Sequence, residues 1–372
     1  MPGGTRDSTP RRRAADSAPV PRAARPGVGL SYAGRAPRVD GMAAERVPVY
    51  HTGQNAGRSS GGTGTVSLPA SVSIVEVGPR DGLQNLTQTL PTGEKIRYIR
   101  LLAASGLKSI EVTSFVSPKA VPQLADAAET VAGLRDLPIS PIALVPNLKG
   151  ARNALAAGVR TLNFVFSVGA SHNRSNVNRT REESLADLAG IVALAGEVPG
   201  VRVRASLATA FGCPFEGQPP IAEVLRWVGA AARLGIAEVT LADTVGFANP
   251  ESVRRILAAC RERFPDLTYG VHFHDTRGMG IANALTAMQC GVTVLDAAAG
   301  GLGGCPFAPG ASGNIATEDL VFLCEEMGVK TGVDLARLFE ASRFLQGALP
   351  GVRLPSRVLQ AGLPKARGPI VG

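Results

Sequence analysis

Residues 269–297 have the sequence YGVHFHDTRGMGIANALTAMQCGVTVLDA. A β-rich run at 269–274 ends in polar residues. An amphipathic segment of helical length follows at 279–290, and a second β-rich run occupies 292–297. A strand, a helix and a strand joined by short loops form one unit of a parallel sheet.

The same unit recurs along the chain from residue 71 onward. We expect strands at 73–77, 109–115, 141–146, 161–168, 201–208, 238–243, 269–274 and 292–297. We expect helices at 92–104, 118–134, 148–157, 181–195, 221–234, 250–264, 279–290 and 313–327. Eight such repeats over about 255 residues predict an α/β fold of the (β/α)8 TIM-barrel type.

Polar residues gather toward the carboxyl ends of these runs, which form the active-site face of such a barrel. They are Arg80, Asp81, Glu111, Asn147, Asp243, His272 and His274. A doubly wound open sheet is the alternative α/β architecture. No GxGxxG motif follows the first run, which argues against that alternative.

The charge of the 372-residue chain is concentrated at its amino end. Residues 1–70 hold ten Arg and four acids, a balance of +6, so the remaining residues carry only +3 of the net +9. We predict that 1–70 is a disordered basic tail rich in Pro, Gly and Arg, and that 71–372 is the catalytic barrel with a short C-terminal helical extension. A transit peptide and a true start at Met42 are alternative interpretations of the tail.

Composition also limits the partners and the compartment. No run approaches the roughly 20 apolar residues of a membrane span, and the tail lacks interleaved aromatic residues for stacking on nucleic acid. Five cysteines form no CxxC pair, as expected for a reducing compartment. We therefore expect a cytoplasmic protein, with the mitochondrial matrix as the alternative. Four cysteines are expected to be buried, and Cys305 stands apart between glycines and a proline.

A metal site is predicted near the carboxyl ends of the strands. His272 and His274 are two residues apart on a strand and face the same side, so both imidazoles can reach one ion. Asp81 and Asn314 could complete an N2O2 set. Such a set suits Mn or Mg, and imidazole also admits Zn, Co or Ni. The alternative to metal binding is that both imidazoles form hydrogen bonds within a polar core.

Three separated motifs carry a resemblance to a known family. They are VEVGPRDGLQN at 75–85, HFHDT at 272–276, and GLGGCP at 301–306 with GASGN at 310–314. Together they resemble the 3-hydroxy-3-methylglutaryl-CoA (HMG-CoA) lyase family, part of a metal-dependent TIM-barrel superfamily that includes isopropylmalate and homocitrate synthases. The resemblance covers about residues 72 to 346. It implies that Asp81, His272, His274 and Asn314 bind Mg or Mn, and that the chain forms a homodimer.

Four further residues acquire expected roles from the resemblance, and each has a simpler alternative. Arg80 would stabilise an enolate or thioester oxyanion, or be half of a surface ion pair. Glu111 would support Arg80 or the metal ligands, or belong to a buried ion pair with a purely structural role. Asp243 would move the substrate hydroxyl proton, or cap a turn. Cys305 would protonate the acetyl-CoA enolate from a mobile loop, or be a packed cysteine. Residues 171–179 could hold the CoA moiety or form a solvated loop.

The resemblance implies a carbon–carbon lyase that cleaves (S)-3-hydroxy-3-methylglutaryl-CoA to acetyl-CoA and acetoacetate, usually in leucine catabolism. A lyase for another acyl-CoA such as citramalyl-CoA is the first alternative. An acyl-CoA-dependent synthase is disfavoured because those relatives carry a substantial C-terminal portion. A non-catalytic binding protein and a nucleic-acid accessory factor are the alternatives from other classes.

Overall fold

Eight parallel strands close into a barrel in which each strand pairs with the next and β8 pairs with β1. The strands are β1 (Ser73–Glu76), β2 (Ser109–Ser114), β3 (Ser140–Leu144), β4 (Thr161–Ser167), β5 (Arg202–Ala208), β6 (Glu238–Asp243), β7 (Thr268–Phe273) and β8 (Val294–Ala297). The computed structural model describes residue 3 and residues 67–304 and 313–364. The predicted (β/α)8 barrel is confirmed, with strand ends shifted by no more than a few residues.

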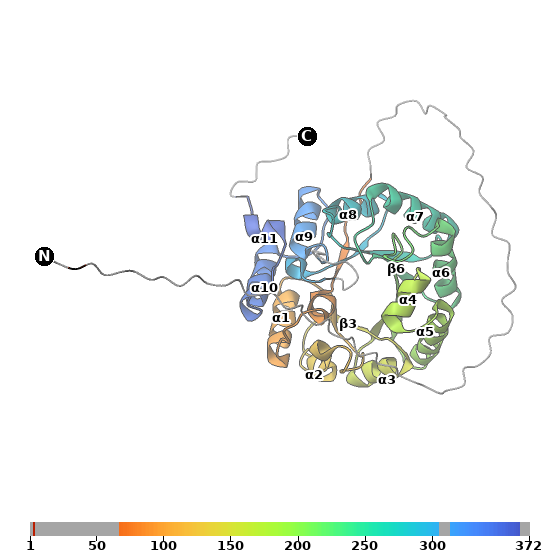
Figure 1. Cartoon of the computed structure of the whole chain (residues 1–372), viewed down its shortest axis with the longest axis horizontal. Helices are drawn as coiled ribbons and strands as arrows, with labels where there is room; N and C mark the ends of the chain where they lie inside the picture. Colours follow the sequence, from red (N-terminus) through yellow and green to blue (C-terminus); the bar gives the residue numbers. More distant parts are fainter. Residues whose placement is uncertain (1–2, 4–66, 305–312, 365–372) are drawn as a thin grey trace, which may run out of the picture. The chain divides into compact units, whose positions relative to one another are not determined.

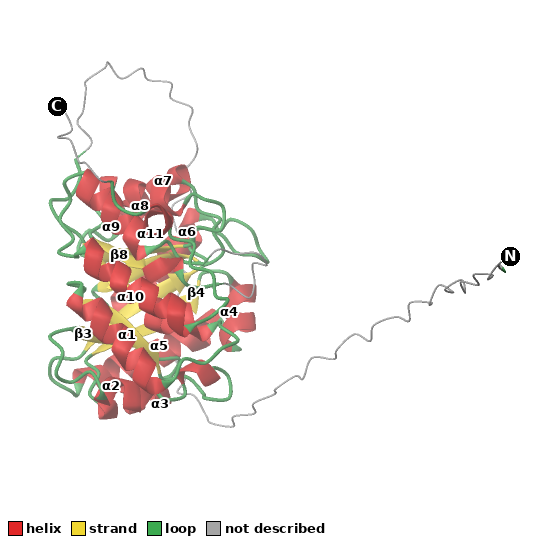
Figure 2. Cartoon of the chain, turned by 90° about the vertical axis from the view of Figure 1, so that its left-hand side faces the viewer, coloured by secondary structure: helices red, strands yellow, loops and turns green. Residues whose placement is uncertain are grey.

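Helices form a ring outside the strands (Figure 1). They are α1 (Thr92–Ala104), α2 (Ala127–Ala132), α3 (Leu148–Ala157), α4 (Ala170–Val177), α5 (Arg181–Gly196), α6 (Ile221–Arg233), α7 (Pro250–Arg263), α8 (Gly280–Gln289), α9 (Thr317–Glu326), α10 (Leu335–Ala348) and α11 (Arg357–Ala361). After the last barrel helix the chain returns along the barrel, so that α10 packs against α1 (Figure 2). Within the described residues no helix is long and apolar enough to cross a membrane.

Two segments differ from the predicted helices. The single helix expected at 118–134 is instead a 3-10 turn, Pro122–Leu124, followed by the short α2. A proline inside a helix removes one backbone donor and clashes with the preceding turn, which explains the break at Pro122. Helix α4 was not predicted, because its Ser- and Asn-rich sequence has low helix propensity. It ends at Asn178 in the left-handed conformation.

The amino end of the barrel is lined by small hydroxyl side chains. The first residues of β1 to β4 are Ser73, Ser109, Ser140 and Thr161, where barrels commonly place large branched side chains. They line a cavity of about 570 Å³ at this end. The polar residues singled out by the sequence lie at the other end of the strands.

The turn after β1 carries two of those residues. Gly78–Gly82 form a π-helical turn in which the Asp81 N–H donates to the Val77 carbonyl at 2.7 Å. A Cβ at Gly78 would lie 2.6 Å from Glu76 Oε1 and 2.8 Å from the Tyr98 hydroxyl, so only glycine fits there. The turn holds Arg80 and Asp81 buried at the carboxyl end of the barrel.

Candidate active site

Asp81, His272 and His274 come together at the carboxyl end of the barrel. One carboxylate oxygen and one ring nitrogen from each histidine all lie within 4.8 Å of one another. Strand alternation accounts for the pair of imidazoles, because Phe273 between them turns away to pack against Phe211. The sequence predicted this grouping.

Asn314, the fourth predicted ligand, lies beside the other three. Its Nδ2 donates to Asp81 Oδ2 at 2.8 Å and to the Leu302 carbonyl at 3.1 Å. Its backbone forms an isolated antiparallel bridge with His274. All four predicted ligands therefore share one site, although they come from distant parts of the chain.

The electrostatics of the four residues fit a divalent cation. Burial opposes ionisation of Asp81, but Arg80 and the two histidines outweigh it and lower the pKa of Asp81 to about 2. Burial lowers the pKa of His274 to about 4, which keeps its imidazole neutral. His274 Nδ1 and Asn314 Oδ1 are buried and have no hydrogen-bond partner among the described residues. Unpaired buried polar atoms are costly, and a bound cation would satisfy the Asn314 oxygen and the lone pair of the neutral His274 ring.

Asp296 on β8 supports the site and was missed as a candidate. Its Oδ2 lies 3.4 Å from His272 Nδ1. Burial lowers the pKa of His272, but the hydrogen bond to Asp296 and the charge of Asp81 raise it overall. The available sequence signal was an acid inside the apolar run 294–297, the same signal that drew attention to Glu111.

Arg80 is buried, so the alternative of a surface ion pair is wrong. Its Nη1 donates to Asp81 Oδ1 at 2.7 Å, and its Nε donates to Glu111 Oε2 at 2.6 Å. Glu111 is fixed in turn by the Asn163 side chain at 2.8 Å, and Asn163 accepts from Ser206. Only part of the guanidinium's donor set is used in these contacts, which leaves N–H groups that can bind a substrate oxygen.

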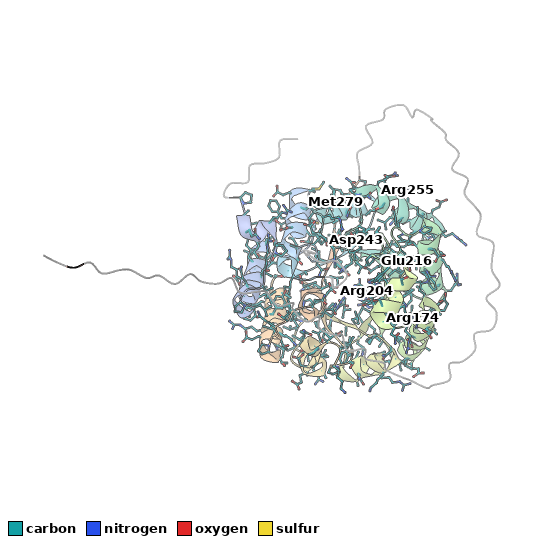
Figure 3. All side chains as sticks on the ribbon, in the orientation of Figure 1. Arg174, Arg204, Glu216, Asp243, Arg255 and Met279 are labelled. Atoms are coloured by element: carbon teal, nitrogen blue, oxygen red, sulfur yellow. The ribbon has the colours of Figure 1, made fainter. Side chains whose placement is uncertain are left out.

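Asp243 closes β6 inside the ring of helices (Figure 3). Its Oδ1 accepts from the Phe247 N–H at 2.8 Å, so the expected turn contact is present. Its Oδ2 is buried without a hydrogen-bond partner among the described residues. Burial raises the pKa of Asp243 to about 6. One carboxyl oxygen thus anchors the turn and the other is available for chemistry.

Three further sequence expectations concern Cys305, the other four cysteines and the segment 171–179. Cys305, the predicted proton donor, lies outside the described residues. Of the four cysteines expected to be buried, Cys213, Cys260 and Cys324 are buried, whereas Cys290 at the end of α8 is half-buried. The segment at 171–179, for which the sequence left a CoA-holding segment and a solvated loop as alternatives, forms most of α4, so the loop alternative is wrong. Its Asn173 side chain accepts from the Ser167 N–H at 2.8 Å.

A closed (β/α)8 barrel with a carboxylate, two imidazoles and an amide at the carboxyl ends of its strands defines a class of barrel enzyme built to hold a cation. The chain belongs to the HMGL-like family, whose model matches residues 71–345.

Named relatives agree with this assignment. The chain is 46% identical to hydroxymethylglutaryl-CoA lyase YngG of Bacillus subtilis over 293 residues, 78% of this chain and 97% of the relative. It is 43% identical to the mitochondrial hydroxymethylglutaryl-CoA lyase of Mus musculus over 79% of this chain and 90% of that protein. A solved HMG-CoA lyase from Acinetobacter baumannii, in complex with coenzyme A and 3-methylmalate, is 44% identical with a TM-score of 0.76. That comparison covers 81% of this chain and 98% of the solved chain.

Proposed function

We propose that the chain is a carbon–carbon lyase that cleaves (S)-3-hydroxy-3-methylglutaryl-CoA to acetyl-CoA and acetoacetate. One observation carries the proposal. The grouped Asp81, His272, His274 and Asn314 lie beside the buried guanidinium of Arg80. Asp243, which interacts electrostatically with His272, has one carboxyl oxygen without a hydrogen-bond partner among the described residues. The coenzyme A in the Acinetobacter relative supports an acyl-CoA substrate.

The four grouped residues would hold Mg²⁺ or Mn²⁺, because the carboxylate and amide oxygens suit these ions and the family resemblance implies them; the two imidazoles would also admit Zn²⁺, Co²⁺ or Ni²⁺. When bound, the ion would act as a Lewis acid and make a hydroxyl group coordinated to it easier to deprotonate. His274 Nδ1 and Asn314 Oδ1 support this assignment, since they are buried acceptors that lack any other partner among the described residues.

The remaining residues would transfer protons and stabilise the negative charge that develops on the substrate. Asp243 would take the proton of the tertiary hydroxyl, while the bond between C2 and C3 breaks and C3 becomes the ketone of acetoacetate. Arg80 would stabilise the acetyl-CoA enolate oxygen with its remaining donors, and Glu111 would keep the guanidinium in place. The Cys305 thiol would then protonate the enolate carbon; this role rests on the sequence resemblance alone.

The assembly follows from the resemblance, and the compartment follows from the composition of the chain. We propose a homodimer, and we propose the cytoplasm as the compartment, with the mitochondrial matrix as the alternative if the amino-terminal residues act as a transit peptide.

Acetoacetate release from HMG-CoA tests the proposal. Exhaustive treatment with EDTA should abolish turnover, and added Mn²⁺ or Mg²⁺ should restore it. His274→Ala should weaken Mn²⁺ binding and turnover, whereas His51→Ala, outside the family match, serves as the control and should behave as the wild type. Full activity after complete metal removal would overturn the cation site, and absence of acetoacetate under all conditions would overturn the lyase.

A further inference from the structure

We infer that Asp296 and Arg204 are positioning residues that hold His272 with its Nε2 free for the cation. This inference rests on the proposed cation site. It adds two residues, from β8 and β5, that neither the sequence motifs nor the family match assigns a role.

The contacts run from the amino end of the barrel to the site. Arg204 Nε lies 3.2 Å from Glu238 Oε1, and Arg204 Nη2 donates to Thr240 Oγ1 at 2.5 Å and to Asp296 Oδ1 at 3.0 Å. The second oxygen of Asp296 faces His272 Nδ1 at 3.4 Å. The parallel register of β7 and β8 explains this last contact, because His272 and Asp296 are paired residues.

The position of these charges argues against a purely structural role. Arg204 and Asp296 are 3% and 5% exposed and lie inside a barrel whose interior positions usually carry Val, Ile or Leu. Desolvation costs buried ion pairs most of their Coulombic gain, so apolar residues would stabilise the barrel as well or better. A requirement for a carboxylate at His272 accounts for the pair.

The carboxylate determines which ring nitrogen of His272 carries the proton. An acceptor at Nδ1 retains a proton there, so the lone pair of the neutral ring lies on Nε2. Arg204 fixes the carboxylate's orientation through Asp296 Oδ1. Without it, Asp296 could rotate, and the imidazole ring would lose its fixed orientation.

Asp296→Asn is the direct test, because it keeps the size of the side chain and replaces one oxygen with an N–H donor. If the amide oxygen stays on Arg204, the amide nitrogen faces His272 Nδ1 and favours the opposite tautomer. Mn²⁺ affinity, measured by electron paramagnetic resonance, should fall about 10- to 100-fold. Long-range ¹H–¹⁵N spectra of the Mg²⁺-loaded protein should show His272 protonated at Nδ1 in the wild type only. The chain has four histidines, so their signals can be resolved.

Lys95→Met provides a matched control. It breaks another buried ion pair, Lys95 with Asp126 at 2.6 Å, which links α1 to the residue before α2. This variant should lose stability but retain wild-type Mn²⁺ affinity. Should Asp296→Asn fail to fold, Arg204→Lys keeps the charge but loses the guanidinium fork, and should weaken Mn²⁺ binding several-fold.

The possible results distinguish the positioning role of Asp296 and Arg204 from the cation site on which it depends. Weaker Mn²⁺ binding in a folded Asp296→Asn or Arg204→Lys protein, with an altered His272 tautomer, supports the positioning role. Wild-type affinity and tautomer in the variants would overturn it while leaving the cation site intact. A wild-type protein that binds no Mn²⁺ would instead overturn the cation site itself.

Discussion

Arg80 combines two properties at this site: it stabilises buried carboxylates, and it has donors left for a substrate. Its guanidinium neutralises two buried carboxylates, Asp81 and Glu111, and still has donors for a substrate oxygen. We therefore expect a mutation at Arg80 to change stability and catalysis together. Only a second substitution can separate the two effects.

Arg80→Gln should lower kcat on the order of a hundredfold or more, with a smaller effect on KM, because the lost donor acts on charge that develops in the transition state. It should also destabilise the fold, since Glu111 is left buried without its cation. The double variant Arg80→Gln/Glu111→Gln should regain stability in urea titrations but not kcat. Recovery of kcat in the double variant would show that Arg80 acts only through folding.

The raised pKa of Asp243 predicts how activity depends on pH. Burial raises the pKa of Asp243 to about 6, so the carboxylate form needed to accept a proton appears as the pH rises through that value. We expect kcat/KM to increase across this range in the wild type. Asp243→Asn should lose most of its activity, and the residual rate should no longer show that increase. The same pH limb in the variant would assign it to another group.

At the scale of elements, two buried carboxyls hold the turn after β8: Glu76 joins it to the turn after β1, and Glu318 joins it to α9. Glu76 Oε1 accepts from the Gly78 N–H at 2.8 Å and from the Ala299 N–H at 2.9 Å. Glu318 on α9 accepts from the Gly300 N–H at 2.9 Å. The Glu76 contacts hold the turn that carries Arg80 against Ala299–Gly301, where the glycine-rich segment begins, and Glu318 holds the same segment from α9.

Burial raises the pKa of Glu76 and of Glu318 from 4.5 to about 7. Because the folded-state values are the higher ones, the stabilising contribution is complete below pH 4.5 and is lost as the pH rises through about 7. The unfolding free energy should fall across this window by up to roughly 3 kcal/mol per carboxyl. Glu76→Gln and Glu318→Gln should each flatten the fall, because an amide does not titrate and its oxygen still accepts from the backbone N–H groups, while its NH2 can donate to the hydroxyl of Thr317 or Ser342.

Urea titrations from pH 4.5 to 8 measure this effect. The control is Glu251→Gln, which removes an exposed carboxylate from α7 and should retain the wild-type fall. Glutamine variants that keep the full pH dependence would show that other groups are responsible.

For the whole molecule, periodicity and motif position were enough to predict the barrel and the place of Asp81, His272, His274 and Asn314. Parallel strands bring their carboxyl ends to one face, so the strand assignments grouped Asp81, His272 and His274. Asn314 lies beyond the last strand, and its place in the set came from the motif resemblance. Asp296 and Arg204 could not be assigned in the same way. Their roles depend on which strands become neighbours and in what register when the barrel closes. The prediction of one helix at 118–134 was wrong for a local reason, which is the proline at position 122.

The amino-terminal residues give the last prediction. Deleting residues 1–66 should leave the melting temperature, Mn²⁺ affinity and steady-state kinetics essentially unchanged. The first barrel strand begins at Ser73, and the deleted stretch has no sustained apolar periodicity with which to pack on the barrel. The deletion removes a balance of +6 and leaves +3, so salt-sensitive binding to DNA, if the full chain shows any, should disappear with it. A large drop in melting temperature would instead mean that these residues contribute to the stability of the barrel.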